Sequence, residues 1–110
     1  MRVVLKKGKT NAPYTFAFVD SDDRSIVRSE NYVARKSALN GIESVKRNCL
    51  NNARYEMKEA KNGKYFFNLK ASNGRVVGTS TFYETVEQRI FGIAKLKIGA
   101  PDAVMVEQQK

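Results

Sequence analysis

The sequence predicts an α+β fold: two tandem β-β-β-α-β repeats form one mainly antiparallel sheet, with two helices on one face. Three observations support this prediction. Residues 14–32 (YTFAFVDSDDRSIVRSENY) and 65–83 (YFFNLKASNGRVVGTSTFY) share one hairpin pattern, 51 residues apart. A helical pattern follows each hairpin. A unit of about 50 residues is marginal alone, so we expect both units to share one core, related by an internal pseudo-two-fold.

The second hairpin carries the clearest local signal. Apolar residues alternate over 65–71, Asn73-Gly74 follows, and a β-rich run continues over 75–80. Asn-Gly between two such runs predicts a type I′ turn, in which both central residues have positive φ. Residues 65–80 should therefore form two antiparallel strands.

The remaining elements follow from periodicity. We expect further strands at residues 2–7, 14–19, 25–29, 54–60 and 103–107. One helix is expected within 32–48 and another over 85–98. The predicted apolar stripes are Leu39, Ile42, Val45 and Cys49 in the first helix, and Ile90, Ile93 and Leu96 in the second.

Each predicted helix contains a glycine, Gly41 in the first and Gly92 in the second. Glycine inside a helix costs about 1 kcal/mol relative to alanine. Its presence at matched positions of two diverged units predicts that the helix backbone approaches the sheet or its neighbour closely there.

Several short motifs together resemble the YegP-like family, a domain of unknown function in small bacterial and archaeal proteins. They are FNLKASNG at 67–74, Ser80 with Tyr83, NGIESVK at 40–46, and NGKY at 62–65. The likeness covers residues 2–98 in two copies. It implies repeated β-β-β-α-β units in one sheet, with exchanged C-terminal strands, a fused pseudo-dimer. It implies no activity. The sequence departs from the pattern at Asp22-Asp23, where the family favours Asn-Gly, and at Val33-Ala34, before the first helix.

Length and charge set the broad class. The 110 residues suit a single domain, with repeat 1 at about 2–51 and repeat 2 at about 52–107. Because both halves of the two-fold are present in one chain, we expect a monomer. The net charge of +9, from 20 basic and 11 acidic residues, is spread over both halves. Such a balance favours polyanions or an anionic surface, but it is also common on ordinary soluble proteins.

The composition argues against several kinds of chemistry. The sequence has no histidine and one cysteine, so Ser-His-Asp and Cys-His catalysis, a zinc site and an internal disulfide are not expected. Cys49 continues an apolar stripe and is interpreted as a core thiol. We predict no cofactor and no metal. A single cysteine, no signal peptide and no bilayer-spanning stretch favour the cytoplasm and no membrane association.

The acidic segment Asp20-Ser21-Asp22-Asp23 resembles the start of a calcium loop. The rest of such a loop is missing, and the matched segment of the second repeat, 71–74, is an ordinary turn. We interpret the segment as a turn, because aspartate tolerates left-handed backbone and forms Asx-turns.

No motif names a ligand. The first function hypothesis is a non-catalytic binding or accessory module, with a protein or a small molecule as its partner. The alternative is single-stranded nucleic-acid binding through the basic open face of the sheet. On that face Phe66 would stack on a base, and Lys70 or Lys58 would contact phosphate. In the first repeat, Thr15, Ala17 and Val19 are expected to point to the same side.

Overall fold

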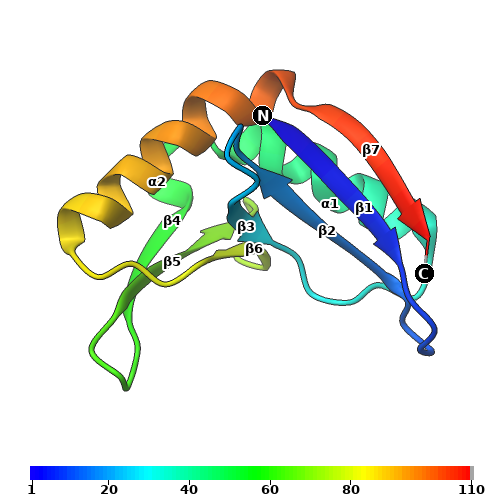
Figure 1. Cartoon of the computed structure of the whole chain (residues 1–110), viewed down its shortest axis with the longest axis horizontal. Helices are drawn as coiled ribbons and strands as arrows, with labels where there is room; N and C mark the ends of the chain where they lie inside the picture. Colours follow the sequence, from blue (N-terminus) through cyan, green and yellow to red (C-terminus); the bar gives the residue numbers. More distant parts are fainter. Residues whose placement is uncertain (110) are drawn as a thin grey trace.

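The computed structural model describes residues 1–109 and contains one sheet covered by two helices (Figure 1). The strands are β1 (Arg2–Lys7), β2 (Tyr14–Val19), β3 (Ser25–Arg28), β4 (Tyr55–Glu59), β5 (Tyr65–Lys70), β6 (Val76–Ser80) and β7 (Val104–Gln109). The α-helices are α1 (Arg35–Asn48) and α2 (Val86–Gly99), and short 3-10 turns, η1 (Asn52–Arg54) and η2 (Ala100–Asp102), follow them.

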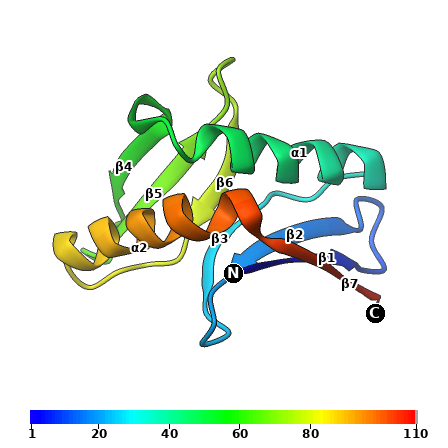
Figure 2. The ribbon, with the colours of Figure 1, turned by 90° about the horizontal axis from the view of Figure 1, so that it is seen from above.

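The strand order shows the internal two-fold. It runs β4-β5-β6-β3-β2-β1-β7, so that the two three-stranded meanders meet at β3 and β6. Every pair is antiparallel except β1 with β7. Both helices lie on the same face of the sheet, as the two views show (Figures 1 and 2). The predicted α+β fold with two repeats is therefore confirmed.

The exchange of strands between repeats goes in one direction only. β7, which follows α2, crosses to pair with β1 of the first repeat. The strand that follows α1 is β4, and it pairs with β5 inside the second repeat. One strand thus ends the first repeat and begins the second, which leaves seven strands where two complete units would have eight.

The core lies between the sheet and the helices. The fully buried side chains include Phe16 and Phe18 of β2 and Phe67 and Leu69 of β5. The helices add residues at matched positions: Ile42 and Val45 from α1, and Ile93 and Leu96 from α2. Cys49 is a buried free thiol, as predicted, and burial raises its pKa. Within the described residues, neither helix is long and apolar enough to cross a bilayer.

The two helix glycines are explained by two tyrosines. A Cβ built on Gly41 would lie 2.7 Å from the hydroxyl of Tyr32, and one on Gly92 would lie 2.1 Å from the hydroxyl of Tyr83. Each tyrosine precedes its helix and is held by a bridge to the first residue of its hairpin, Tyr14 or Tyr65. The expected close approach to the helix backbone is confirmed and has the same cause in both repeats.

Three local predictions were wrong. Val19 is buried rather than outward, because the β2–β3 register shifts at Phe18/Val19 and strict alternation ends there. Ile90 is 58% exposed, because the buried side of α2 is formed by Gly92, Ile93 and Leu96. The Asn73-Gly74 turn is not type I′: within the described chain only Gly74 of this pair has positive φ, as in a three-residue hairpin loop.

Candidate binding cleft between the repeats

Two clefts lie between the repeats, and the internal two-fold relates them. The larger, here called the Asp20 cleft, has a volume of about 570 Å³. The smaller, here called the Ala71 cleft, has about 280 Å³. In each, the hairpin turn of one repeat faces the tyrosine and helix of the other. All but one of the residues lining the Ala71 cleft match a lining residue of the Asp20 cleft when shifted by 51 positions.

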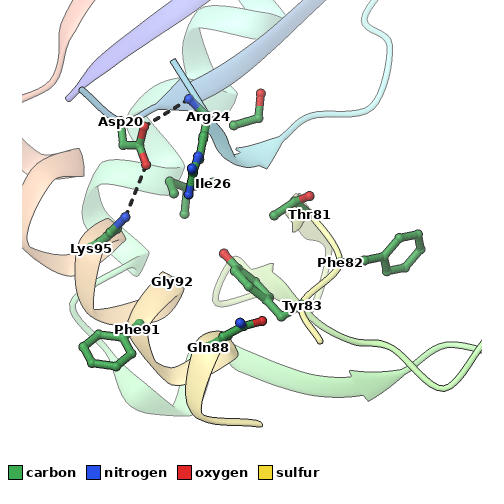
Figure 3. A pocket seen from close by; sticks show the side chains of 11 residues that line it. Asp20, Arg24, Ile26, Thr81, Phe82, Tyr83, Gln88, Phe91, Gly92 and Lys95 are labelled. Carbon is green, nitrogen blue, oxygen red and sulfur yellow. Dashed lines mark hydrogen bonds and ion pairs between the residues drawn. The ribbon is translucent and has the colours of Figure 1, made fainter. Parts of the chain in front are cut away.

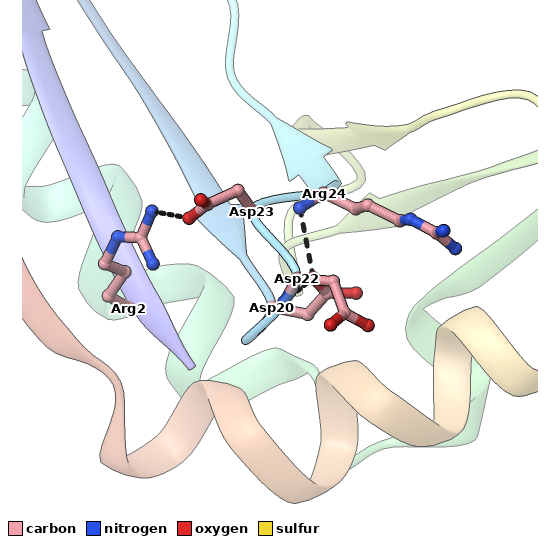
Figure 4. Close-up of polar contacts among 5 residues, drawn as sticks. All are labelled: Arg2, Asp20, Asp22, Asp23 and Arg24. Carbon is pink, nitrogen blue, oxygen red and sulfur yellow. Dashed lines mark hydrogen bonds and ion pairs between the residues drawn. The ribbon is translucent and has the colours of Figure 1, made fainter.

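The carboxylate of Asp20 connects the hairpin turn to α2 in the larger cleft (Figures 3 and 4). One of its oxygens accepts hydrogen bonds from the backbone N–H groups of Asp22 (2.9 Å) and Arg24 (3.0 Å). The other lies 3.3 Å from the Nζ of Lys95 on α2. The hydrogen bond from Arg24 is the main cause that lowers the pKa of Asp20, and that from Asp22 and the nearby Lys95 add to it. Asp20 is therefore ionised at neutral pH, with both oxygens engaged.

The acidic turn is shaped as a turn and not as a cage for a cation. Asp23 has φ 63, the left-handed value that Gly74 has in the second repeat. Its carboxylate forms an ion pair with Arg2 on β1 (Figure 4), whereas Asp20 faces Lys95 (Figure 3). The carboxylates of Asp20 and Asp23 are thus directed to different cationic partners.

Arginines occupy matched positions in the two clefts and have different surroundings. Arg75 of the Ala71 cleft lies 3.9 Å from Glu30 in an exposed ion pair. Arg24 of the Asp20 cleft forms no ion pair within residues 1–109, because the position that matches Glu30 is Thr81. The Asp20 cleft therefore presents a guanidinium whose charge is not neutralised by a carboxylate.

The α2 side of the Asp20 cleft is more apolar and more basic than the α1 side of the Ala71 cleft. Phe91 is 69% exposed and stands where α1 has Asn40. Lys95 stands where α1 has Ser44. Beneath these residues the side chain of Tyr83 points into the cleft between the two repeats (Figure 3).

The hydroxyl of Tyr83 is buried and has no hydrogen-bond partner in the part of the chain that the structure describes. Desolvation raises its pKa, and the nearby negative charge of Asp20 raises it further. Tyr83 is therefore neutral at physiological pH. Its side chain lines the cleft.

The residues predicted for nucleic-acid contact lie elsewhere, on the sheet face opposite the helices. Phe66 is the register partner of Lys58 in the β4–β5 pair. The ring of Phe82 packs edge-on against Phe66, with centroids 5.6 Å apart. The face therefore carries two neighbouring aromatic rings instead of one.

Lys70 is less available than the sequence indicated. Its Nζ lies 3.0 Å from the carboxylate of Glu56, which also accepts a hydrogen bond from Asn68 at 3.1 Å. The hydrogen bond from Asn68 is the first cause that lowers the pKa of Glu56, followed by that from Lys70. Phe66 and Lys58 thus lie together, whereas Lys70 already has an anionic partner.

Sequence reasoning did not identify the cleft, although the signal was present. Aligning the repeats at the 51-residue offset places Arg24 on Arg75, Lys95 on Ser44 and Phe91 on Asn40. What the sequence could not show is that a turn of one repeat meets the helix of the other. That contact depends on the β3–β6 pairing at the two-fold.

Comparison with known proteins places the chain in a family. The model of a domain of unknown function, DUF1508, matches residues 10–56 and again 60–107. The chain belongs to the DUF1508 family. The two matched segments each run from a hairpin through a helix into the next strand, so the family unit contains β2-β3-α1-β4 and then β5-β6-α2-β7.

Relatives in this DUF1508 family cover nearly the whole chain. The UPF0339 protein in the ptx operon 5′ region of Stutzerimonas stutzeri is 44% identical over 94 residues, which is 86% of this chain and 85% of that protein. The solution NMR structure of YegP from Escherichia coli, described as a protein of unknown function, has a TM-score of 0.91 at 35% identity and covers 98% of this chain and 92% of that one. The NMR structure of the UPF0339 protein SO3888 from Shewanella oneidensis has a TM-score of 0.90 at 33% identity, covering 98% and 91% of the two chains. The YegP-like resemblance is confirmed.

Proposed function

We propose that this protein is a non-catalytic binding module, and that its Asp20 cleft holds a small organic anion with an aromatic or apolar part. The observation that carries this proposal is the difference between two matched arginines. Arg75 has Glu30 as its ionic partner, whereas Arg24 has none within the described residues. A carboxylate or phosphate can supply the missing negative charge.

The cleft offers complementary chemistry for such a ligand. A guanidinium binds carboxylate and phosphate with two parallel hydrogen bonds, so Arg24 can orient the anionic group. Lys95, whose side chain is 51% exposed, lies 3.3 Å from the Asp20 carboxylate and offsets its negative charge inside the cleft. Phe91 and Ile26 line the same cleft and can contact the apolar part. A volume of about 570 Å³ lies in the range usual for small-molecule sites.

The titratable groups of the cleft support binding without catalysis. A general acid or base works best when its pKa lies near the operating pH. The pKa of Asp20 is lowered and that of Tyr83 is raised, so both move away from neutrality. Each therefore keeps one protonation state while a ligand binds.

The test uses phenyl phosphate, benzoate and inorganic phosphate as probes, titrated into the ¹⁵N-labelled protein. We expect saturable shifts of the amides in residues 20–26 and 88–95. Arg24→Gln should weaken phenyl phosphate binding by about tenfold or more. Arg75→Gln, the matched control, should leave it unchanged. Phe91→Asn should weaken the binding of phenyl phosphate more than the binding of inorganic phosphate. Equal effects of Arg24→Gln and Arg75→Gln, or no saturable shift, would contradict the proposal.

A second candidate function is single-stranded nucleic-acid binding on the opposite sheet face, favoured by the pairing of Phe66 with Phe82. Stacking on an aromatic ring contributes about 1–3 kcal/mol per base and depends little on salt. Phe66→Ala should therefore weaken binding to single-stranded RNA or DNA by about tenfold at roughly 150 mM salt. If Phe66→Ala binds as the parent does, only the net charge of +9 attracts the nucleic acid.

We further propose that the protein acts as a monomer in the cytoplasm. The two repeats supply both halves of the pseudo-two-fold within one chain, which supports a monomer. Cys49 is a buried free thiol, which suits a reducing compartment. Light scattering at micromolar concentration and fractionation of cells test these two expectations.

A further inference from the structure

The two ends of the sheet are covered differently. β1 is covered by β7, which pairs with it in parallel from Arg2↔Val104 to Lys7↔Gln109. β4 occupies the matched position at the other end, and no strand lies beyond it in the described chain. The register shows which residues of β1 and β4 correspond. Leu5 of β1 pairs with Phe16, and Met57 of β4 pairs with Phe67, which is the counterpart of Phe16 in the second repeat, so Met57 corresponds to Leu5.

The backbone of β4 is oriented to accept a strand. The N–H of Phe67 donates to Ser80 Oγ (2.9 Å) and so faces β6. In an antiparallel ladder the residue opposite such a position also directs its N–H and C=O away from the partner strand. Met57 therefore presents both groups at the sheet edge. Leu5 directs its N–H and C=O toward β7 in the same way. At the start of this strand pair, the backbone N–H of Val104 donates to the carbonyl of Met1.

Exposed apolar side chains lie at this edge, beside the charged residues of β4. Leu5 is 2% exposed, whereas Met57 is 51% exposed. The first residue of α1, Arg35, forms an ion pair with Glu107 of β7, the residue that lies beside Leu5. The first residue of α2 at the matched position is Val86, which is 38% exposed. One helical turn further, Ile90 is 58% exposed. The cation that α2 places at this end of the sheet is Arg89, which already donates to the carbonyl of Lys58 at 3.0 Å and lies over the ring of Tyr65, so the position that matches Arg35 supplies no cation for an acidic residue that corresponds to Glu107.

We propose that β4 accepts an extended segment of another protein as an eighth strand, parallel to β4 and in the register that β7 has on β1. The residue of this segment beside Met57 is apolar, because Val86 replaces Arg35. A second copy of the chain is a poorer occupant. Its own β7 is already paired with β1, and a net charge of +9 opposes close association of two copies.

The probe is a synthetic peptide of residues 103–109 carrying Glu107→Leu, titrated into the ¹⁵N-labelled full chain. We expect saturable shifts at the amides of Met57 and Glu59. The peptide with the natural Glu107 should bind about fivefold or more weakly, because its carboxylate would be placed among apolar groups. In the variant Val86→Arg this preference should be reversed, since the cation of the first repeat is then restored.

A backbone variant tests the strand pairing itself. Met57→Pro removes the outward N–H, and proline is tolerated on an edge strand at such a position. This variant should weaken binding of the peptide by about tenfold. The amide chemical shifts of Phe66 and Asn68 in the free protein should stay as in the parent, which shows that β4 and β5 remain paired. The proposal is overturned if shifts occur only at β1, if Val86→Arg leaves the preference unchanged, or if light scattering shows a dimer that Met57→Pro abolishes. The Val86→Arg result decides the matter if Met57→Pro does not fold.

Discussion

The two clefts show which parts of a duplicated unit are retained and which diverge. Both keep a tyrosine packed on a helix glycine, Tyr32 on Gly41 and Tyr83 on Gly92. Both also keep an arginine at the end of the hairpin turn. The partner of that arginine differs, because Arg75 has Glu30 and Arg24 has Thr81. The packing of the tyrosine on the helix within each repeat is therefore shared, while an arginine without a carboxylate partner is found in the Asp20 cleft and not in the Ala71 cleft.

This difference has a physical reason. The tyrosine and glycine contact each other at the helix backbone, so a change in either one disturbs packing. The lining residues Phe91 and Lys95 are about half exposed or more, and substitution there affects packing little. One cleft could thus acquire aromatic and cationic groups without loss of the common fold.

The largest expected effect comes from filling the shared contact. Gly92→Ala places a Cβ 2.1 Å from the Tyr83 hydroxyl and should destabilise the protein by about 3 kcal/mol, even after the helix gain of about 1 kcal/mol. Gly41→Ala, with 2.7 Å to the Tyr32 hydroxyl, should cost less. Urea denaturation of both variants measures the difference.

Removal of the hydroxyl gives the control. Tyr83→Phe deletes the atom that lies closest to the new methyl group, so the double variant should recover part of the loss. If Gly92→Ala proved as stable as the parent, the tyrosine would not be held against the helix in solution.

Asp20 should give the next largest effect. Asp20→Ala leaves the backbone N–H groups of Asp22 and Arg24 without their acceptor and should cost about 2 kcal/mol. In the second repeat the side chain of Asn73 accepts from Arg75 N at 3.0 Å instead. Adding Asp22→Asn, which recreates that turn, should recover part of the stability. Thermal melts of the single and double variants test this.

The same carboxylate predicts a pH dependence. The folded pKa of Asp20 is lowered, chiefly by the hydrogen bond from Arg24 N, from an ordinary value of 3.8. Its contribution is therefore complete above this value and is lost as the pH falls through the folded pKa. The parent should lose stability below about pH 4 more steeply than Asp20→Asn. Parallel slopes for the two proteins would show that Asp20 is not held by these donors.

Periodicity predicted the strands and helices, because each repeat displays its own pattern and the second copy checks the first. It predicted less well where tertiary contacts decide the outcome. Ile90 has the spacing of a core residue, yet the helix turns Ile93 and Leu96 inward and leaves it exposed. The cleft lay outside sequence reasoning because its two walls come from different repeats, brought together by the β3–β6 pair. Phe82 packs beside Phe66 although the two are 16 residues apart in sequence, and no short-range sequence pattern predicts a contact over that separation.

The smallest expected effects concern the helix starts. Thr85 caps α2 by accepting from Gln88 N at 3.1 Å, while Ala34 at the matched position of α1 has no side-chain cap. Thr85→Ala should cost about 1 kcal/mol, and Ala34→Thr should add about 0.5–1 kcal/mol. Denaturant melts of both variants check the comparison. Two neutral changes would mean that the helices begin elsewhere in solution.

The most direct test of the divergence between the clefts observes both arginines in one spectrum. The Nε–Hε signals of Arg24 and Arg75 are followed while phenyl phosphate is added at about 150 mM salt. We expect the Arg24 signal to move along a saturating curve and the Arg75 signal, screened by Glu30, to stay in place. Movement of both signals to the same extent, or a linear drift of Arg24 without saturation, would contradict the proposal that the Asp20 cleft is an anion site.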